Sequence, residues 1–384
     1  NMSKRNDLTL CVFPNDPIIS YFNKGEIKTK YFNPENIFKS IHIISAIDSD
    51  VDEEKIKKIA GNAKLKIHCI GNLNLKNYQS KLKPVEGIIQ KIQPDVIRAH
   101  NPLMNGWLAA KVAKKFNIPL VLSLHDNYEK DVRGQALKNK KIFRYLKLKY
   151  TSKMLEPFVI QNSTKIICVY RYILPYVRKF GGNDIEIIYN RVYPLKFNKI
   201  EKEKKQPSKL SIIYVSRLAK EKNQECLIKA IKDVDVNLLL IGNGPDYEKL
   251  KQLTKNLKIE DKVDFKKSVP NESLVEYYNN ADIFASPGKQ GGIGIPIIEA
   301  MACGLPIITK KRENEESEDM DDAIMFVKNN PDWFKDAIKK IMTNKKLKEK
   351  MIQKSLYEFS KINGNIMERK EAKVYYDVLK LAKN

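Results

Sequence analysis

Short apolar runs alternate with helical patterns along the first half of the chain. Unbroken apolar runs bounded by turn residues are typical of buried parallel strands. They fall at Leu8–Phe13, Leu65–Cys69, Asp95–Ala99, Leu120–Leu124, Lys165–Val169 and Ile185–Ile188. Apolar positions at helical spacing predict helices between them, near residues 80–92, 102–117, 137–162 and 171–180. This alternation predicts a parallel sheet covered by helices on both faces.

Residues 198–209 are charged and contain a proline, which is typical of a linker. The alternation then restarts, with strands predicted at 210–216, 236–242, 263–265, 282–285 and 306–309 and helices at 222–234, 246–257, 271–280 and 296–303. A last helix near 366–382 carries Val374, Val378 and Leu381 on one stripe. The chain is therefore predicted to be an α/β protein of two doubly wound domains, residues 1–197 and 210–365, followed by a terminal helix in 366–384. In such domains ligands bind at the carboxyl ends of the strands, and two of them leave a cleft between these ends.

Composition narrows the environment and the partners. No apolar stretch approaches the ~20 residues of a membrane span, and the given N-terminal residues lack the long apolar core that is expected of a secretory signal. The five cysteines are scattered, so we expect neither a disulfide framework nor structural zinc, and a cytoplasmic location. The net charge is +24, and residues 1–200 hold 35 basic but 17 acidic residues. This asymmetry indicates either an anionic partner for the first domain or a lysine-rich compositional habit.

Residues 291–308, GGIGIPIIEAMACGLPII, combine a glycine turn with an apolar helix. A glycine turn at a helix N-terminus exposes backbone N–H groups beside the positive end of the helix dipole, which suits a phosphate. Glu299 on that helix is placed to reach hydroxyl groups of a ribose or sugar. The same pattern also describes a buried loop–helix–strand unit, and the segment alone does not separate these interpretations.

Two basic residues follow the first strand of the second domain. Arg217 comes directly after that strand and Lys222 opens the next helix, so they are positioned to neutralise a diphosphate. A solvated basic turn is the alternative. Gly242 and Gly244 occupy the next strand–helix junction, where they allow a tight turn and a close backbone approach.

Two histidines follow strands of the first domain. His125 ends the strand 120–124, and His100 ends the strand 95–99. A neutral imidazole at either position can bond a sugar hydroxyl, and we expect one of the two to do so. No cluster of His, Cys and Asp has the spacing of metal ligands, so no metal is expected.

Residues 138–154, KNKKIFRYLKLKYTSKM, form a basic and aromatic helical segment. Phe143, Leu146, Tyr150 and Met154 share one face, beside a stripe of lysine and arginine. The pattern fits a helix lying on an anionic bilayer, and it fits equally a stripe packed into the core with solvated lysines.

These motifs, in this order, resemble the retaining glycosyltransferases of family four, which have the GT-B fold. The resemblance is carried by Ser216-Arg217-Leu218 with Lys222, Gly242-Asn243-Gly244-Pro245, Ser268-Val269-Pro270, Ala281-Asp282-Ile283 and Glu299-Ala300-Met301-Ala302-Cys303-Gly304-Leu305-Pro306. The first half matches more loosely, through Asp95-Val96-Ile97, Ala99-His100 and the strand ending at His125.

The resemblance implies two Rossmann-like domains facing across a cleft, with the terminal helix crossing back to the first. It implies a nucleotide-sugar donor, with a UDP-sugar favoured, and a glycan or lipid-linked acceptor. Arg217 and Lys222 would neutralise the departing diphosphate without a metal, Glu299 would hold the ribose, and His125 would contact the transferred sugar. The other implied donor residues are Gly242, Gly244, Val269, Gly291, Gly292, Ile293, Gly294 and Ile295, and the implied acceptor-side residues are Gly25, His100 and Asn190.

The sequence departs from the family pattern at four places. The family usually has an acid where this chain has Gly291, which leaves the donor sugar open. Asn190-Arg191-Val192-Tyr193 brings a cation into a stretch that is Asn-Gly-Val-Asp in the family, and residues 312–322 are acidic where the family is glycine-rich. The usual Gly-Gly turn after the first strand is missing, and Asn23-Lys24-Gly25-Glu26 is a candidate replacement.

Four functions follow from this comparison. The first is an active transferase that extends a surface glycan or lipid-linked glycan at the inner face of the plasma membrane. The second is a non-catalytic sugar-nucleotide-binding protein, suggested by Gly291. The third, a DNA-modifying glycosyltransferase, is suggested by the charge, but the aromatics of 138–154 suit lipid better than base readout, so nucleic acid is not an expected partner. The fourth is a sugar-nucleotide epimerase on the same fold.

Overall fold

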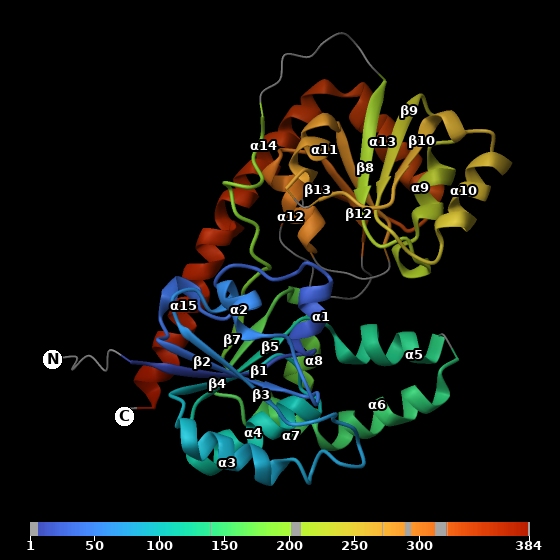
Figure 1. Ribbon diagram of the computed structural model, residues 1–384. Coiled ribbons are helices and arrows are strands. Elements are labelled where there is room, and N and C mark those ends of the chain that lie inside the picture. Colours follow the sequence, from blue (N-terminus) through green and yellow to red (C-terminus); the bar gives the residue numbers. More distant parts are fainter. Residues whose placement is uncertain are drawn as a thin grey trace. The chain divides into compact units, whose positions relative to one another are not determined.

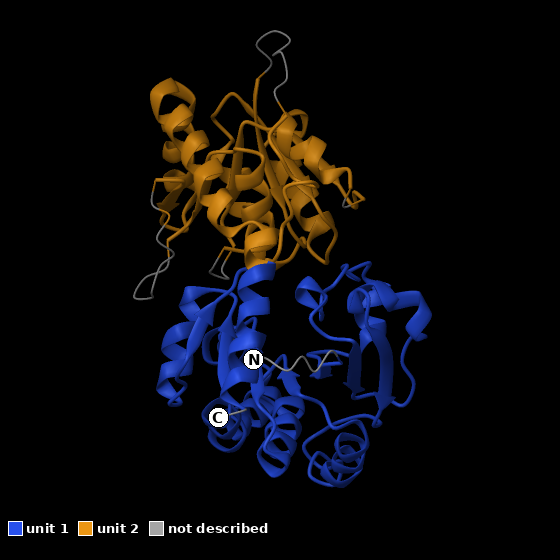
Figure 2. Ribbon diagram, turned by 90° about the vertical axis from the view of Figure 1, so that its left-hand side faces the viewer, with its two compact units in different colours: residues 1–189, 368–384 blue, residues 190–367 orange. Residues whose placement is uncertain are grey.

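A computed structural model describes residues 7–138, 140–200, 209–270, 272–288, 293–311, 320 and 322–382 (Figure 1). The chain divides into two compact units, which are residues 1–189 with 368–384, and residues 190–367 (Figure 2). The first unit ends at Tyr189, whereas the sequence placed the boundary at residue 197. Most of the predicted linker 198–209 and of the acidic segment 312–322 lies outside the described residues.

The first unit is built on a seven-stranded parallel sheet in the order β3-β2-β1-β4-β5-β6-β7. Its strands are β1 (Thr9–Phe13), β2 (Ser40–Ser45), β3 (Lys64–Cys69), β4 (Val96–Ala99), β5 (Leu120–Leu124), β6 (Lys165–Cys168) and β7 (Ile185–Ile187). The six predicted strands are confirmed to within one residue at each end. Strand β2 was missed, because two serines and a histidine interrupt the apolar run by which the other strands were found.

The helices predicted near 80–92, 102–117 and 171–180 are confirmed, whereas two short helices before residue 60 were not predicted. The first unit contains α1 (Ile18–Asn23), α2 (Glu53–Ile56), α3 (Leu82–Ile92), α4 (Met104–Phe116), α5 (Gly134–Lys138), α6 (Ile142–Met154), α7 (Glu156–Gln161) and α8 (Leu174–Lys179). The single helix predicted at 137–162 is wrong. A π-helical turn at Tyr128–Arg133 runs into α5, Lys140 takes a left-handed conformation, and Pro157 lies in the first turn of α7. The chain therefore forms three short helices there instead of one long helix.

The terminal helix α15 (Gly364–Leu381) belongs to the first unit from Glu368 onward. Alternation along β4 sends Ile97 and Ala99 into the main apolar core, and Arg98 to the opposite face. There the Arg98 guanidinium donates to the Glu371 carboxylate and, at 2.7 Å, to the Tyr375 hydroxyl. Both charged side chains are buried, so α15 is held on the sheet by an ion pair out of water.

The second unit is a six-stranded parallel sheet in the order β10-β9-β8-β11-β12-β13. Its strands are β8 (Leu210–Val215), β9 (Val236–Ile241), β10 (Val263–Lys266), β11 (Ile283–Ser286), β12 (Ile307–Lys310) and β13 (Ile324–Val327). Its helices are α9 (Gln224–Ala230), α10 (Tyr247–Asn256), α11 (Leu274–Asn280), α12 (Ile295–Ala302), α13 (Pro331–Thr343) and α14 (Lys345–Ile362). The sequence analysis identified neither β13 nor α13 and α14, although Asn330 and Asn344 cap these helices in the usual way.

Both sheets reverse their strand order beside the first strand of the unit. In the first unit the reversal lies between β1 and β4, and in the second between β8 and β11. Adjacent crossovers leave the sheet on opposite faces at such a point, which opens a crevice at the carboxyl ends of the strands where ligands bind. The loops after β8 and β11, and those after β1 and β4, are therefore the places to look for sites.

We expect Glu371→Gln to destabilise the first unit strongly, because it leaves the Arg98 charge buried without a counter-charge. Loss of one partner of a buried pair costs about 3–5 kcal/mol. Urea denaturation followed by hydrogen exchange of β4 peptides measures the effect. Glu54→Gln is the control: this exposed carboxylate pairs with Lys57 at 3.6 Å and should contribute under about 1 kcal/mol. Equal effects of the two substitutions would contradict the assignment.

Candidate functional site: the carboxyl edges of the two sheets

The loop that carries Arg217 is fixed by a buried glutamine. Gln224, at the start of α9, donates its side-chain amide to the Ser216 hydroxyl and to the Arg217 carbonyl, both at 2.9 Å. The Arg217 side chain is exposed. The backbone is thus held rigidly while the guanidinium is presented to solvent at the point of strand reversal. The sequence analysis missed Gln224, because its role depends on where the loop returns in space.

Gly242 and Gly244 are required by the approach of two loops. A Cβ on Gly242 would lie 2.0 Å from the Ser216 carbonyl oxygen, and one on Gly244 would lie 2.1 Å from that of Leu218. The same loops are joined by a bond from the Leu218 N–H to the Asn243 carbonyl, at 3.0 Å. Their glycines therefore act here by allowing this packing, which sets the position of Arg217.

Lys222 lies beside the loop that follows β11. Its carbonyl accepts a hydrogen bond from the Tyr214 hydroxyl at 3.1 Å, and a Cβ on Gly288 would lie 3.8 Å from the Lys222 Cα. Tyr214 is buried, and burial raises the pKa of its hydroxyl. The structure thus brings Arg217, Lys222 and the segment leading into residues 289–292 to one edge of the second sheet.

The helix α12 begins after Gly294, whose carbonyl accepts from the Ile297 N–H at 3.0 Å. Ile293 is buried and Ile295 is half-buried. Gly291 and Gly292, assigned to the phosphate turn, lie outside the described residues. Val269 follows the edge strand β10 and is half-buried. The roles of these residues stay predictions.

Glu299 is buried and bonded within the second unit. Its carboxylate accepts a hydrogen bond from the Tyr278 hydroxyl at 2.8 Å, and Tyr278 on α11 is fully buried. Burial, followed by the nearby Glu299 carboxylate, raises the pKa of the Tyr278 hydroxyl well above its usual value, so this group acts as a donor. The bond fixes the orientation of Glu299, and sequence spacing gave no signal for it.

His100 and His125 meet at the edge of the first sheet. Their rings stack with centroids 5.8 Å apart, and the buried Nε2 atom of each has no hydrogen-bond partner among the described residues. Removal from water, reinforced by the positive charge of Arg98, lowers the pKa of His125 to about 4. Removal from water, the positive charge of Arg98 and the neighbouring His125 ring put the pKa of His100 well below its usual value. Both imidazoles are therefore neutral at pH 7.

Two other residues that were predicted on the acceptor side, Gly25 and Asn190, lie away from the two histidines in sequence. Gly25 takes a left-handed φ of 69° just after α1, where its N–H bonds the Phe22 carbonyl. It therefore ends a helix rather than forming a turn directly after β1. Asn190 is the first residue of the second unit and is half-buried. Neither role in acceptor binding is tested by this placement.

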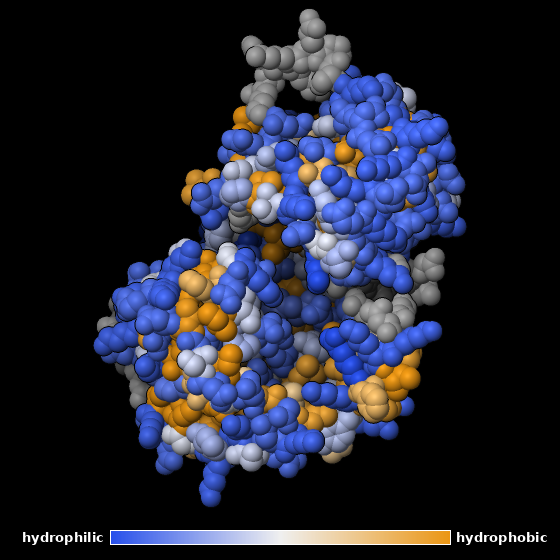
Figure 3. Space-filling view, turned by 45° about the vertical axis from the view of Figure 1, so that its right-hand side comes forward, coloured by the Kyte–Doolittle hydropathy of each residue, from blue (hydrophilic) through white to orange (hydrophobic). Residues whose placement is uncertain are grey.

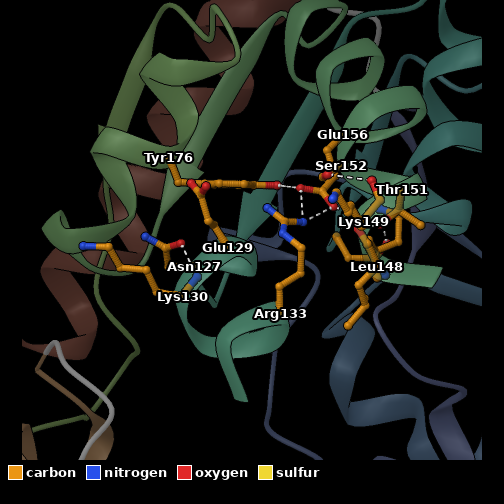
Figure 4. A network of polar contacts seen from close by, with 12 residues as sticks. Asn127, Glu129, Lys130, Arg133, Leu148, Lys149, Thr151, Ser152, Glu156 and Tyr176 are labelled. Atoms are coloured by element: carbon orange, nitrogen blue, oxygen red, sulfur yellow. Dashed lines mark hydrogen bonds and ion pairs between the residues drawn. The ribbon is translucent and has the colours of Figure 1, made fainter. Parts of the chain in front are cut away.

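A buried polar network holds the π-helical turn that follows His125 (Figure 4). The fully buried Glu156 carboxylate accepts from the Arg133 guanidinium at 2.6 Å, from the Tyr176 hydroxyl at 2.6 Å and from the Thr151 hydroxyl at 3.0 Å. Three donors satisfy this one acid, so the charge is tolerated in the interior. The network joins the π-helical turn, α6 and α8, and the sequence analysis did not find it.

The apolar face of α6 is at the surface. Phe143, Leu146, Tyr150 and Met154 are 92%, 54%, 42% and 57% exposed. The interpretation of this stripe as part of the core is therefore wrong. Within the described ranges, no helix has both the length and the apolar character of a membrane crossing. No three potential metal ligands gather among those same residues, and the expectation of a metal-free reaction stays a prediction.

Comparisons with known proteins bear on both halves of the chain. Residues 41–194 match the family model described as Glycosyltransferase Family 4, and residues 196–356 match that of Glycosyl transferases group 1. An uncharacterized glycosyltransferase of Methanocaldococcus jannaschii is 27% identical over 279 residues, which cover 72% of this chain and 73% of that protein. The alpha-monoglucosyldiacylglycerol synthase of Streptococcus pneumoniae is 27% identical over 248 residues, which cover 60% of this chain and 55% of that protein.

A solved structure extends the likeness to the fold. HepE of Anabaena, in complex with UDP and glucose, superimposes with a TM-score of 0.70, at 14% identity, over 96% of this chain and 100% of that one. The two family matches together cover most of the chain, from residue 41 to residue 356, and the observed pair of parallel sheets is the architecture that the sequence motifs implied. The chain belongs to the group 1, family 4 glycosyltransferases of the GT-B fold.

Proposed function

We propose that the protein is a retaining glycosyltransferase that moves a sugar from a nucleotide-sugar donor to a glycan or lipid-linked glycan, without a metal. The observation that carries the proposal is the rigid presentation of Arg217 at the strand reversal of the second unit, beside Lys222 and the loop after β11. The acceptor hydroxyl oxygen forms the new bond to the anomeric carbon as the bond from that carbon to the diphosphate oxygen breaks. The hydroxyl proton passes to the departing diphosphate, and the leaving group takes the electron pair. Arg217 and Lys222 stabilise that charge, and preorganised charge stabilisation is commonly the largest catalytic term.

The remaining donor contacts follow from the same edge of the sheet. The amides at the start of α12 add the field of a helix N-terminus, although Pro296 in its first turn has no N–H. Glu299, oriented by Tyr278, is assigned to the ribose hydroxyls, because a carboxylate is an acceptor with about four lone-pair sites. The UDP in the HepE structure, whose fold matches this one, supports a UDP-sugar as donor.

On the first unit, His125 is assigned to a hydroxyl of the transferred sugar. Its Nε2 is buried and has no partner among the described residues, and leaving such an atom unpaired costs about 1–3 kcal/mol. A ligand hydroxyl that pairs with it recovers this cost. The acceptor is assigned to the same unit, and the name of the streptococcal relative, a diacylglycerol glycosylating enzyme, supports a lipid-linked acceptor. We place the reaction in the cytoplasm, at the inner face of the plasma membrane.

Turnover with UDP-, GDP- and ADP-sugars tests the proposal, with membrane lipid extracts as the acceptor pool and mass spectrometry as the readout. We expect a glycosylated lipid or glycan from a UDP-sugar, with the anomeric configuration retained by NMR. Nucleotide binding without any product or donor hydrolysis would instead favour a non-catalytic binding protein, the possibility raised by Gly291. No engagement of any nucleotide sugar would contradict both.

Arg217→Ala should weaken UDP binding by about 10- to 100-fold, since a hydrogen bond to a charged group contributes about 1.5–3 kcal/mol. Isothermal titration with UDP measures this. Lys220→Ala is the matched control, because Lys220 is an exposed cation in the same loop and has no assigned role. Unchanged affinity in Arg217→Ala would remove the diphosphate from this edge of the sheet.

The ring protons of His125 should show no titration between pH 5 and 8 in NMR spectra, because its folded pKa is about 4. An unfolded histidine titrates near 6.5, so the unfolded chain binds more protons between these values. The contribution of neutral His125 to stability is therefore full above about pH 6.5 and is lost as the pH falls toward 4. Relative to the wild type, His125→Gln should lose less stability between pH 7 and 4.5 in urea denaturation. Titration near pH 6.5 would contradict the burial of this ring.

A further inference from the structure

Exposed large apolar side chains concentrate in one hairpin of the first unit. Thirteen such side chains are exposed among the described residues, and six belong to α5 and α6: Leu137, Ile142, Phe143, Leu146, Tyr150 and Met154. Figure 3 shows, on one face of the molecule, that hydrophobic residues reach the surface in patches within a hydrophilic surround. A cluster of this density on a surface helix marks an interaction site.

The α6 members of this cluster form a single strip, here called the α6 strip and defined as Ile142, Phe143, Leu146, Tyr150 and Met154. At 100° per residue they occupy about 120° of the helix circumference. Leu148 and Thr151 on the other side of the helix are buried. The helix is therefore already packed against its own unit through another side, and the α6 strip is a second apolar face whose side chains are exposed.

Basic residues border the α6 strip on both sides. Lys149 lies just outside one edge and Lys147 just outside the other, while Lys153 lies within the arc of the strip. Residues 138–154 contain seven basic residues and no acidic one. The lysines in this arrangement can keep their ammonium groups at a polar boundary while their stems follow the apolar strip.

Side-chain contacts hold helix α6, which bears the strip, against the rest of the first unit. Thr151 donates to the buried Glu156 carboxylate, which also holds Arg133 and Tyr176 (Figure 4). The Tyr150 hydroxyl lies 3.4 Å from that of Tyr78, which packs edge-on against Trp107. The face is thus formed before any partner binds, and Phe143, at 92% exposed, is its most prominent side chain.

We propose that the α6 strip docks on an anionic lipid bilayer, with its apolar side chains at the level of the headgroups and its lysines on lipid phosphates. This docking surface rests on the proposed function in one respect, which is that the bilayer would present the lipid-linked acceptor. Charge decides between the possible occupants. A symmetric dimer through this face would set seven cations against seven with no acid between them, whereas an anionic membrane complements them. Apolar and aromatic side chains flanked by lysines are the pattern of helices that lie in a membrane interface.

Vesicle flotation of the full chain tests this, without donor or acceptor. The vesicles are phosphatidylcholine with one-third phosphatidylglycerol, or phosphatidylcholine alone, at about 0.1 M and about 0.5 M salt. We expect binding to the anionic vesicles, weaker at high salt, and little to the neutral ones. Phe143→Glu should lower anionic binding by about 10-fold or more, since it removes an apolar anchor and adds a like charge to the lipid.

Leu195→Glu is the matched control, since Leu195 is 96% exposed and lies in the second unit. It should bind vesicles as the wild type does. Both variants should fold and keep their affinity for UDP, because both side chains project into solvent.

Equal binding to both vesicle types, equal loss in both variants, or a dimer in sedimentation that Phe143→Glu abolishes would overturn the docking surface. Those results leave the donor site untouched. Failure to engage any nucleotide sugar would overturn the proposed function and leave vesicle binding as it is.

Discussion

Close backbone contact at two glycines determines the geometry of the loop to which the donor diphosphate is assigned. The loop after β8 lies so near the loop after β9 that a Cβ on Gly242 or Gly244 would collide with a carbonyl oxygen of residue 216 or 218. Gln224, at the start of α9, also holds the loop after β8 through two side-chain hydrogen bonds. Arg217 is exposed on a backbone that has almost no freedom, and preorganisation of this kind is what lets a charge stabilise a leaving group without reorganising. The position of the cation is thus a product of packing, not of the Arg217 side chain itself.

In the first unit, buried charged side chains hold the helices in place. Arg98 holds the terminal helix through Glu371, and Glu156 holds the π-helical turn, α6 and α8 through Arg133, Tyr176 and Thr151. Arg98 also helps to keep His125 and His100 neutral, after burial itself. The guanidinium that fixes the C-terminal helix therefore also lowers the pKa of the two histidines at the sheet edge, whereas the Glu371 carboxylate acts on the pKa of His125 in the opposite direction.

The sequence predicted well what short-range patterns determine. The parallel strands, the Arg217 loop and the glycine pair all follow from local runs and motifs, and the resemblance supplied the pairing of the two domains. Features that depend on tertiary partners were missed. Gln224 and Tyr278 act on residues that chain folding brings to them, and Glu156 is an acid with two donors, Arg133 and Tyr176, that are distant in the sequence. Strand β2 was overlooked because its polar residues broke the apolar run. The face of α6 was open to two interpretations, because amphipathic periodicity does not tell which side of a helix meets solvent.

The central claim is that the carboxyl edge of the second sheet holds a nucleoside diphosphate. A crystal structure of the full chain with UDP tests it most directly. The account predicts the diphosphate at the reversal between β8 and β11, with an oxygen in hydrogen-bond reach of the Arg217 guanidinium and another near Lys222. It also predicts the ribose near Glu299, with the Tyr278 bond kept. A nucleotide bound away from the loops after β8 and β11, or one that leaves Arg217 without a phosphate contact, would contradict the account.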